Sequence, residues 1–206
     1  MTEVNIGLEG ILVGETSISD VNGELGELSY RGYPIAELSS RPFVQVVWLL
    51  LFGDWPSAQQ ESQIAQFLSV HSQLTEGEIQ MLKAIPEGTH PMLMLQSMVP
   101  LLDTEPRESL TIPNDSEDAL TGLIIAARLP ALVSAYYRRE RGLEWPLTSY
   151  ASDPIQGFLK SLHGEQAAEH VVEALKVAQI LQMEHSYNAG TFAGRVALST
   201  AAPMAS

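Results

Sequence analysis

The hydrophobic positions change their spacing near residue 34 of this 206-residue chain. Before that point the chain is rich in glycine and carries short stretches of alternating polarity at residues 11–13 and 27–30. Asn22-Gly23, which lies between these two stretches, is typical of a tight turn. We therefore predict a small β-hairpin within residues 1–33.

From residue 34 onward, apolar residues recur every three or four positions, which is the spacing of amphipathic helices. Pro42 suits the first turn of a helix that ends before Gly53, and Ser57 suits the N-cap of the next helix. Thr75 and Glu78 have the spacing of a capping box. The predicted helices are residues 35–38, 41–52, 58–70, 79–85, 90–102, 116–129, 130–141, 155–162 and 167–182.

Pro130 interrupts the apolar pattern of residues 116–141. Because proline lacks an amide hydrogen and suits a first turn, we expect one helix to end at Leu129 and another to begin at Pro130. No strand pattern follows residue 33. The predicted fold is all-α with a small N-terminal β-hairpin, as a single domain over residues 1–206 (hairpin segment 1–33, helical part 34–206).

The composition excludes several classes of function. The formal charge of −14, from 11 basic and 25 acidic side chains, argues against a nucleic-acid partner because an acidic surface repels phosphates. The chain has no cysteine, and its five histidines lack metal-ligand spacing, so we expect neither disulfides nor a metal site. The acidic N-terminus and the short apolar run at 43–52 argue against a leader peptide and a membrane span, and we expect a cytoplasmic protein.

His185 and Asn188 are the strongest candidates for chemistry. They are three residues apart, so one helical turn or a tight cap would let both face a common pocket. A histidine can donate to a carbonyl or carboxylate oxygen, and an asparagine beside it can fix its orientation. The alternative is that His185 is a helix-end residue with a structural role only.

The other histidines favour structural interpretations. His90 precedes a proline at a predicted helix start, which suits a capping or interface residue. His71 and His170 have polar neighbours and are expected at the surface. His163 precedes Gly164 at a predicted helix C-terminus, where a cation is favourable.

Two further clusters admit two interpretations each. The methionines of residues 92–98 suggest either a group of sulfur ligands or, as we favour, helix packing. Arg138, Arg139 and Arg141 suggest either a phosphate site or, again favoured, a solvated basic face.

Residues 181–195 resemble the His-Glu-Leu-Asn-Ala-Ser-Thr-Phe signature of citrate synthases. Further similarities to this family follow in the family's order, at residues 7–10, 14–20, 28–33, 90–92 and 158–165. Because the motifs cover essentially the whole chain, it is identified as a divergent member of the family. The resemblance places it in the N-terminal portion of that fold, as a truncated or split form.

The resemblance implies that His185, with Asn188, binds the keto acid oxaloacetate, which citrate synthases condense with acetyl-CoA. It also implies a homodimer, with the helix that begins near His90 at the interface. Around the signature, Gln182, Ser186 and Gly190 replace the family's usual histidine, glutamate and serine.

The family's other catalytic histidines, its aspartate and its carboxylate-binding arginines find no match in residues 1–206. We therefore assign no catalytic residue to the chain. We expect acetyl-CoA to be a co-substrate only if a complementing C-terminal chain is present. The alternatives are a non-catalytic paralogue that acts as a helical association or regulatory module, and a remnant without function. The choice between citrate and 2-methylcitrate synthesis stays open.

Overall fold

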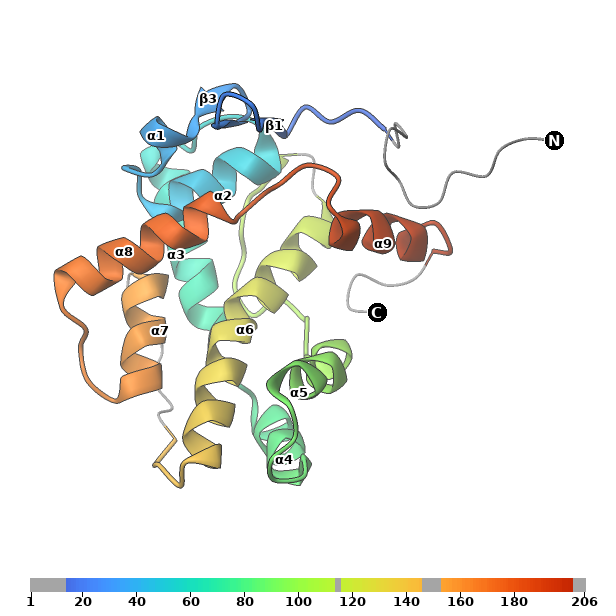
Figure 1. The fold of residues 1–206 in the computed structure, drawn as a ribbon. Coiled ribbons are helices and arrows are strands. Elements are labelled where there is room, and N and C mark those ends of the chain that lie inside the picture. Colours follow the sequence, from blue (N-terminus) through green and yellow to red (C-terminus); the bar gives the residue numbers. More distant parts are fainter. Residues whose placement is uncertain (1–13, 114–115, 146–152, 202–206) are drawn as a thin grey trace.

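The computed structural model describes residues 14–113, 116–145 and 153–201. Helices dominate these residues, which confirms the predicted all-α class (Figure 1). Three strands, β1 (Ser19–Asn22), β2 (Glu27–Tyr30) and β3 (Tyr33–Pro34), form one small sheet. The helices are α1 (Ile35–Leu38), α2 (Phe43–Phe52), α3 (Ala58–His71), α4 (Glu76–Ala84), α5 (Pro91–Met98), the short 3₁₀ helix η1 (Val99–Leu101), α6 (Glu117–Glu140), α7 (Pro154–His163), α8 (Glu169–Leu181) and α9 (Ala189–Leu198).

The sheet is antiparallel in the order β1-β2-β3. Ser19 pairs with Tyr30, so a hairpin lies within residues 1–33 and its turn follows Asn22, but its first strand is residues 19–22, which the sequence pattern did not indicate. The predicted strand at 11–13 lies outside the described residues. The sequence pattern did not indicate β3, which pairs with β2 across Arg31 and Gly32. Both of these residues have positive φ, as a type I′ hairpin turn requires.

Local sequence signals set the helix ends correctly in several places. Ser57 and Gln60 form a capping box at the start of α3, and Thr75 and Glu78 form one at the start of α4. In the second box the Thr75 amide donates to Glu78 Oε2 at 2.6 Å, and the Glu78 amide donates to Thr75 Oγ1 at 3.1 Å. Gly53 ends α2 with φ of 89°. Each of these helix ends needs only contacts between near neighbours in sequence.

Helix α6 runs unbroken through Pro130, so the prediction of two helices at this point is wrong. A proline inside a helix costs about 3 kcal/mol, because it removes one hydrogen bond and crowds the preceding turn. Packing on both sides of the proline outweighs this cost: Ile124 and Leu132 are fully buried, and each such side chain contributes about 1.5–3 kcal/mol. The Ser134 hydroxyl also donates to the Pro130 carbonyl at 2.8 Å.

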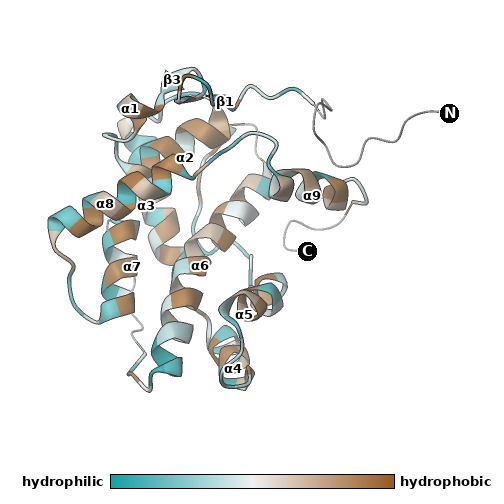
Figure 2. Cartoon of the chain, viewed as in Figure 1, coloured by the Kyte–Doolittle hydropathy of each residue, from teal (hydrophilic) through white to brown (hydrophobic). Residues whose placement is uncertain are grey.

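Three apolar clusters hold the helices together, and α6 contributes to two of them. Figure 2 shows hydrophobic residues along these helices. The first joins α2, α3 and α6, and the second joins α4, α5 and α6. The third packs the sheet and α1 against α2 and α8. By length and composition alone, α6 is apolar enough to cross a membrane. Its contacts with α3, α5 and α7 identify it instead as a core helix.

Helix α9 differs from the other α-helices because none of its residues is buried. Figure 1 shows it extending beyond the N-terminal end of α6, away from α7 and α8. Val196 and Leu198 are exposed on it.

Candidate functional site

The segment between α8 and α9 carries His185 and is attached to the sheet. Tyr30 is fully buried, and its hydroxyl donates to the Ile180 carbonyl at 2.9 Å, at the end of α8. The same hydroxyl accepts from the Glu184 amide at 3.3 Å. Burial raises the pKa of Tyr30, so this hydroxyl stays protonated and able to donate. The sheet therefore fixes where the segment leaves α8.

A second attachment follows immediately along the chain. The Ser186 amide donates to Ser19 Oγ at 3.0 Å and to Glu184 Oε2 at 2.7 Å. Ser186 itself has φ of 55°, a left-handed conformation that turns the chain toward α9. The backbone on both sides of His185 is thus bonded to fixed groups.

Asn188 is the N-cap of α9. Its Oδ1 accepts from the Thr191 amide at 2.8 Å, and its own amide donates to the Ser186 carbonyl at 2.9 Å. An added Cβ at Gly190 would lie 3.3 Å from this oxygen, so a small residue keeps the cap open. The side-chain oxygen of Asn188 therefore caps the helix, and its side-chain NH₂ group makes no hydrogen bond with the described residues.

The His185 side chain is exposed and makes no hydrogen bond with the described residues. The structure places His185 and Asn188 on the same turn between α8 and α9, but no hydrogen bond joins them. Their expected roles as ligand and orienting group stay predictions. What the structure shows is an imidazole on an anchored turn, accessible to a ligand.

Sequence reasoning did not single out Tyr187 and Arg195, which support this turn. The Tyr187 hydroxyl donates to the Glu15 carbonyl at 2.8 Å, and Arg195 Nη1 donates to the same hydroxyl. The Arg195 guanidinium lies 4.7 Å from the centre of the Tyr187 ring. Tyr187 precedes the N-cap of α9, so no helical spacing in the sequence relates it to Arg195.

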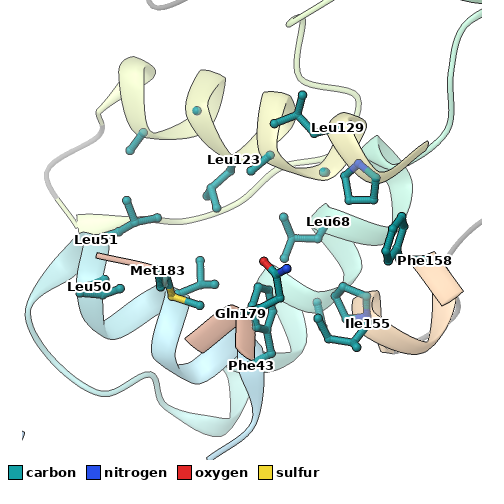
Figure 3. A pocket seen from close by; sticks show the side chains of 18 of the residues that line it. Phe43, Leu50, Leu51, Leu68, Leu123, Leu129, Ile155, Phe158, Gln179 and Met183 are labelled. Atoms are coloured by element: carbon teal, nitrogen blue, oxygen red, sulfur yellow. The ribbon is translucent and has the colours of Figure 1, made fainter. Parts of the chain in front are cut away.

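An apolar groove of about 830 Å³ opens between α2, α3, α6, α7 and α8. Figure 3 shows Leu51, Leu68, Leu123 and Phe158 around it, with Gln179 and Met183 of the α8 end. Glu184, the residue before His185, also lines the groove. The groove and the His185 turn are therefore neighbouring parts of one surface.

Comparison with known proteins assigns this architecture. A family model described as "Citrate synthase, C-terminal domain" matches residues 7–206. The chain belongs to the citrate synthase family. It is 32% identical to a 2-methylcitrate synthase of Mycobacterium tuberculosis, over 96% of this chain and 50% of that protein. It is also 32% identical to the citrate synthase of Mycolicibacterium smegmatis, over 96% of this chain and 52% of that protein.

A solved structure agrees with this assignment. The crystal structure of citrate synthase from Thermotoga maritima MSB8 matches with a TM-score of 0.83 and 25% identity, over 98% of this chain and 53% of that one. The chain spans about half the length of the curated relatives it matches.

Most remaining histidines of this citrate synthase family member lie where the sequence predicts. His90 is the N-cap of α5, and its Nδ1 accepts from the Met92 amide at 3.2 Å. His163 ends α7 before Gly164, and His170 is exposed. The prediction that His71 lies at the surface is wrong, because His71 is fully buried. A backbone amide far along the chain satisfies its ring, which no local pattern reveals.

The methionine and arginine clusters are structural. Met94 and Met98 are buried in the second apolar cluster, as the packing interpretation predicts, whereas Met92 is exposed. Arg138 donates to the carbonyls of Glu144 and Leu162, and Arg139 donates to the carbonyls of Leu82 and Pro86. Two of the three arginines therefore bind backbone carbonyls, so they form neither a phosphate site nor a freely solvated face. In the parts of the chain that the structure describes, no three acidic or histidine side chains group to hold a metal.

Proposed function

We propose that this chain supplies the keto-acid-binding part of a citrate-synthase-type acyltransferase, which joins acetyl-CoA to oxaloacetate. The observation that supports it is the position of His185, the residue that matches the family's keto-acid histidine. It is exposed on a turn that Tyr30 and Ser19 anchor, next to a groove. Oxaloacetate and acetyl-CoA would be substrates, and the proposal needs no bound cofactor.

In such a condensation the α-carbon of the thioester loses a proton and forms a bond to the keto carbon. Negative charge then develops on the keto oxygen, where a hydrogen-bond donor lowers the barrier. His185 is suited to that donor role. A general base must also reach the α-carbon, and we assign none in residues 1–206. We expect this chain by itself to have no turnover.

The apolar groove supports the proposal that a complementing half of the fold packs against this chain. A contiguous apolar surface is unfavourable in water and marks a site where another segment packs. Leu51 is 45% exposed at the edge of the groove, although the groove walls belong to the core helices. We propose that the half of the citrate synthase fold not matched by this chain packs here, as the same or a separate polypeptide.

A homodimer is proposed through α5 and η1. Met92, Leu93 and Leu101 are exposed on this short stretch, although their neighbours Met94 and Met98 are buried. Burial of three large apolar side chains against a second copy would remove them from water. Sedimentation at micromolar concentration should then show a dimer, and a clean monomer would oppose this part of the proposal.

A second candidate function is a non-catalytic association module. The position of Asn188 Oδ1 favours it, because this oxygen caps α9 and no hydrogen bond joins Asn188 to His185. The substitutions Gln182, Ser186 and Gly190 around the signature also favour it.

The test is reconstitution. The chain is purified alone and also co-expressed with the half of the Mycolicibacterium smegmatis citrate synthase that it does not match. Thiol release from acetyl-CoA with oxaloacetate is followed in both preparations. We expect none from the chain alone and turnover from the pair. His185→Ala should lower that turnover by about 10²–10³-fold without loss of helix content.

A groove variant separates docking from chemistry. Leu51→Glu should prevent co-purification of the two halves, whereas Leu143→Glu, at an exposed position that does not line the groove, should not. If the pair assembles but shows no turnover, the association module is the better function. If His185→Ala melts the chain and spares activity in the pair, His185 is structural.

A further inference from the structure

A buried polar network joins α3, α4 and α6 on the side of α6 that carries Arg128. Arg128, Glu78 and His71 are all at most 1% exposed. Arg128 Nη1 forms an ion pair with Glu78 Oε1, and Arg128 Nε donates to the His71 carbonyl at 2.6 Å. Most buried polar groups in proteins have hydrogen-bond partners, and among the described residues Arg128 Nη2 is the atom of this network that lacks one.

This network also holds the connection between η1 and α6. Glu78 Oε1 accepts from the Asp103 amide at 3.0 Å, and His71 Nε2 accepts from the Arg107 amide at 2.8 Å. Further along, Leu110 is buried in the first apolar cluster. Residues 104–109, which we call the connecting segment, therefore lie between two fixed points. Within the segment, Arg107 is the residue whose backbone the network binds.

The partners of His71 allow only one protonation state of its ring. Nδ1 lies 2.8 Å from the Phe67 carbonyl, which can only accept, so Nδ1 carries the hydrogen. Nε2 must then be unprotonated to accept from Arg107. A proton added at Nε2 would point at the Arg107 N–H and replace an attraction by a repulsion.

The charges that face His71 come from every neighbouring element. Arg128 of α6 and Arg107 of the connecting segment oppose a positive ring, whereas Glu108 favours one. Glu78 of α4 is paired with Arg128, and Asp103 is paired with Arg107 at 3.2 Å. Burial lowers the pKa of His71 most, and the two arginines lower it further against the Phe67 carbonyl and Glu108.

We propose that His71 is a proton-sensitive latch: the neutral ring holds the connecting segment against α3, and protonation releases it. The release is local, because Asp103 stays bound to Glu78 and Leu110 stays in the core. The connecting segment follows η1 in the sequence. Leu101 of η1 is exposed, together with Met92 and Leu93 of α5, so acid would loosen the chain that comes directly after these exposed apolar residues.

Amide hydrogen exchange of the full chain, followed by NMR between pH 5 and 8, tests the latch. The exchange rates are corrected for the intrinsic pH dependence of amide exchange. The protection of the Arg107 amide should fall by up to about tenfold per pH unit below about pH 6.5, the ordinary value for histidine. Protection of the Asp103 amide should change much less.

The matched variants are His71→Gln and His170→Gln. Glutamine is uncharged throughout this range, so the pH dependence at Arg107 should vanish in the first variant and persist in the second. An Arg107 amide whose protection is independent of pH in the wild type would overturn the proposal. So would an unchanged pH dependence in His71→Gln.

A spectroscopic measurement on the wild type keeps the test decisive if His71→Gln does not fold. Long-range ¹H–¹⁵N spectra report which ring nitrogen carries the hydrogen. We expect Nδ1–H at pH 7.5 and titration of His71 below pH 6.5. An Nε2–H tautomer, or titration at or above that pH, would refute the latch.

Discussion

The buried pair of Arg128 and Glu78 offers a direct test of how this fold is stabilised. Arg128→Met leaves the Glu78 carboxylate without its cation, and Glu78→Gln leaves the guanidinium without its anion. Both side chains are essentially inaccessible to water, so neither charge can be solvated in place. Removal of one partner of a buried pair costs about 3–5 kcal/mol. A domain has only about 5–15 kcal/mol in total, so either variant should lose a large fraction of its stability.

The double variant distinguishes the cause. If the two residues acted independently, the two losses would add to roughly 6–10 kcal/mol. Because the double variant leaves no unpaired charge, we expect it to be no less stable than either single variant. Urea unfolding, followed by tryptophan fluorescence to which the buried Trp48 contributes, gives the free energies of unfolding. Arg41→Met is the control, since it breaks an exposed pair with Glu37 and should cost less than about 1 kcal/mol.

Two results would refute this reasoning. Single variants that lose less than about 1 kcal/mol would show that the pair behaves like a surface salt bridge. A strictly additive double variant would show that the two charges do not depend on each other.

Three further predictions concern single positions. Pro130→Ala should raise the melting temperature, because it restores a helix hydrogen bond in α6 and removes the crowding; calorimetry measures this. Asn188→Ala should cost α9 about 0.5–2 kcal/mol, seen as faster amide exchange in α9 while α8 is unchanged. The lowered pKa of His71 means that the unfolded chain binds a proton more readily than the folded one. The stability that neutral His71 contributes is therefore complete above about pH 6.5 and is lost as the pH falls toward the folded pKa, by up to about 1.4 kcal/mol per pH unit. His71→Gln should flatten that part of the stability curve.

The accuracy of the sequence predictions follows the distance over which the determining contacts act. The N-cap at Ser57 and the capping box at Thr75 were predicted because each depends on residues three apart in the sequence. The unbroken helix at Pro130 was not predicted, since the side chains that outweigh the proline are buried by other helices. His71 was placed wrongly for the same reason: the amide that satisfies its ring is 36 residues away.

The candidate site shows the same division. The signature placed His185 and Asn188 on one turn, and the structure agrees, because a turn is a local feature. The groove was not found from the sequence, because five helices from different parts of the chain line it. The ion pair between Arg128 and Glu78 was not predicted either. The two residues are 50 apart in the sequence, and their near neighbours in sequence do not indicate that either is buried.

The bond between Tyr30 and the end of α8 has a consequence for synthesis of the chain. The Tyr30 hydroxyl and the Ile180 carbonyl are separated by 150 residues. At ordinary translation rates the sheet leaves the ribosome about 8–30 seconds before its partner on α8 exists. During that interval the inner face of the sheet lacks part of its cover, because Ile180 of α8 belongs to the apolar cluster that packs on Tyr30. The turn that carries His185 is therefore assembled late, and its geometry depends on the sheet, which is synthesised much earlier.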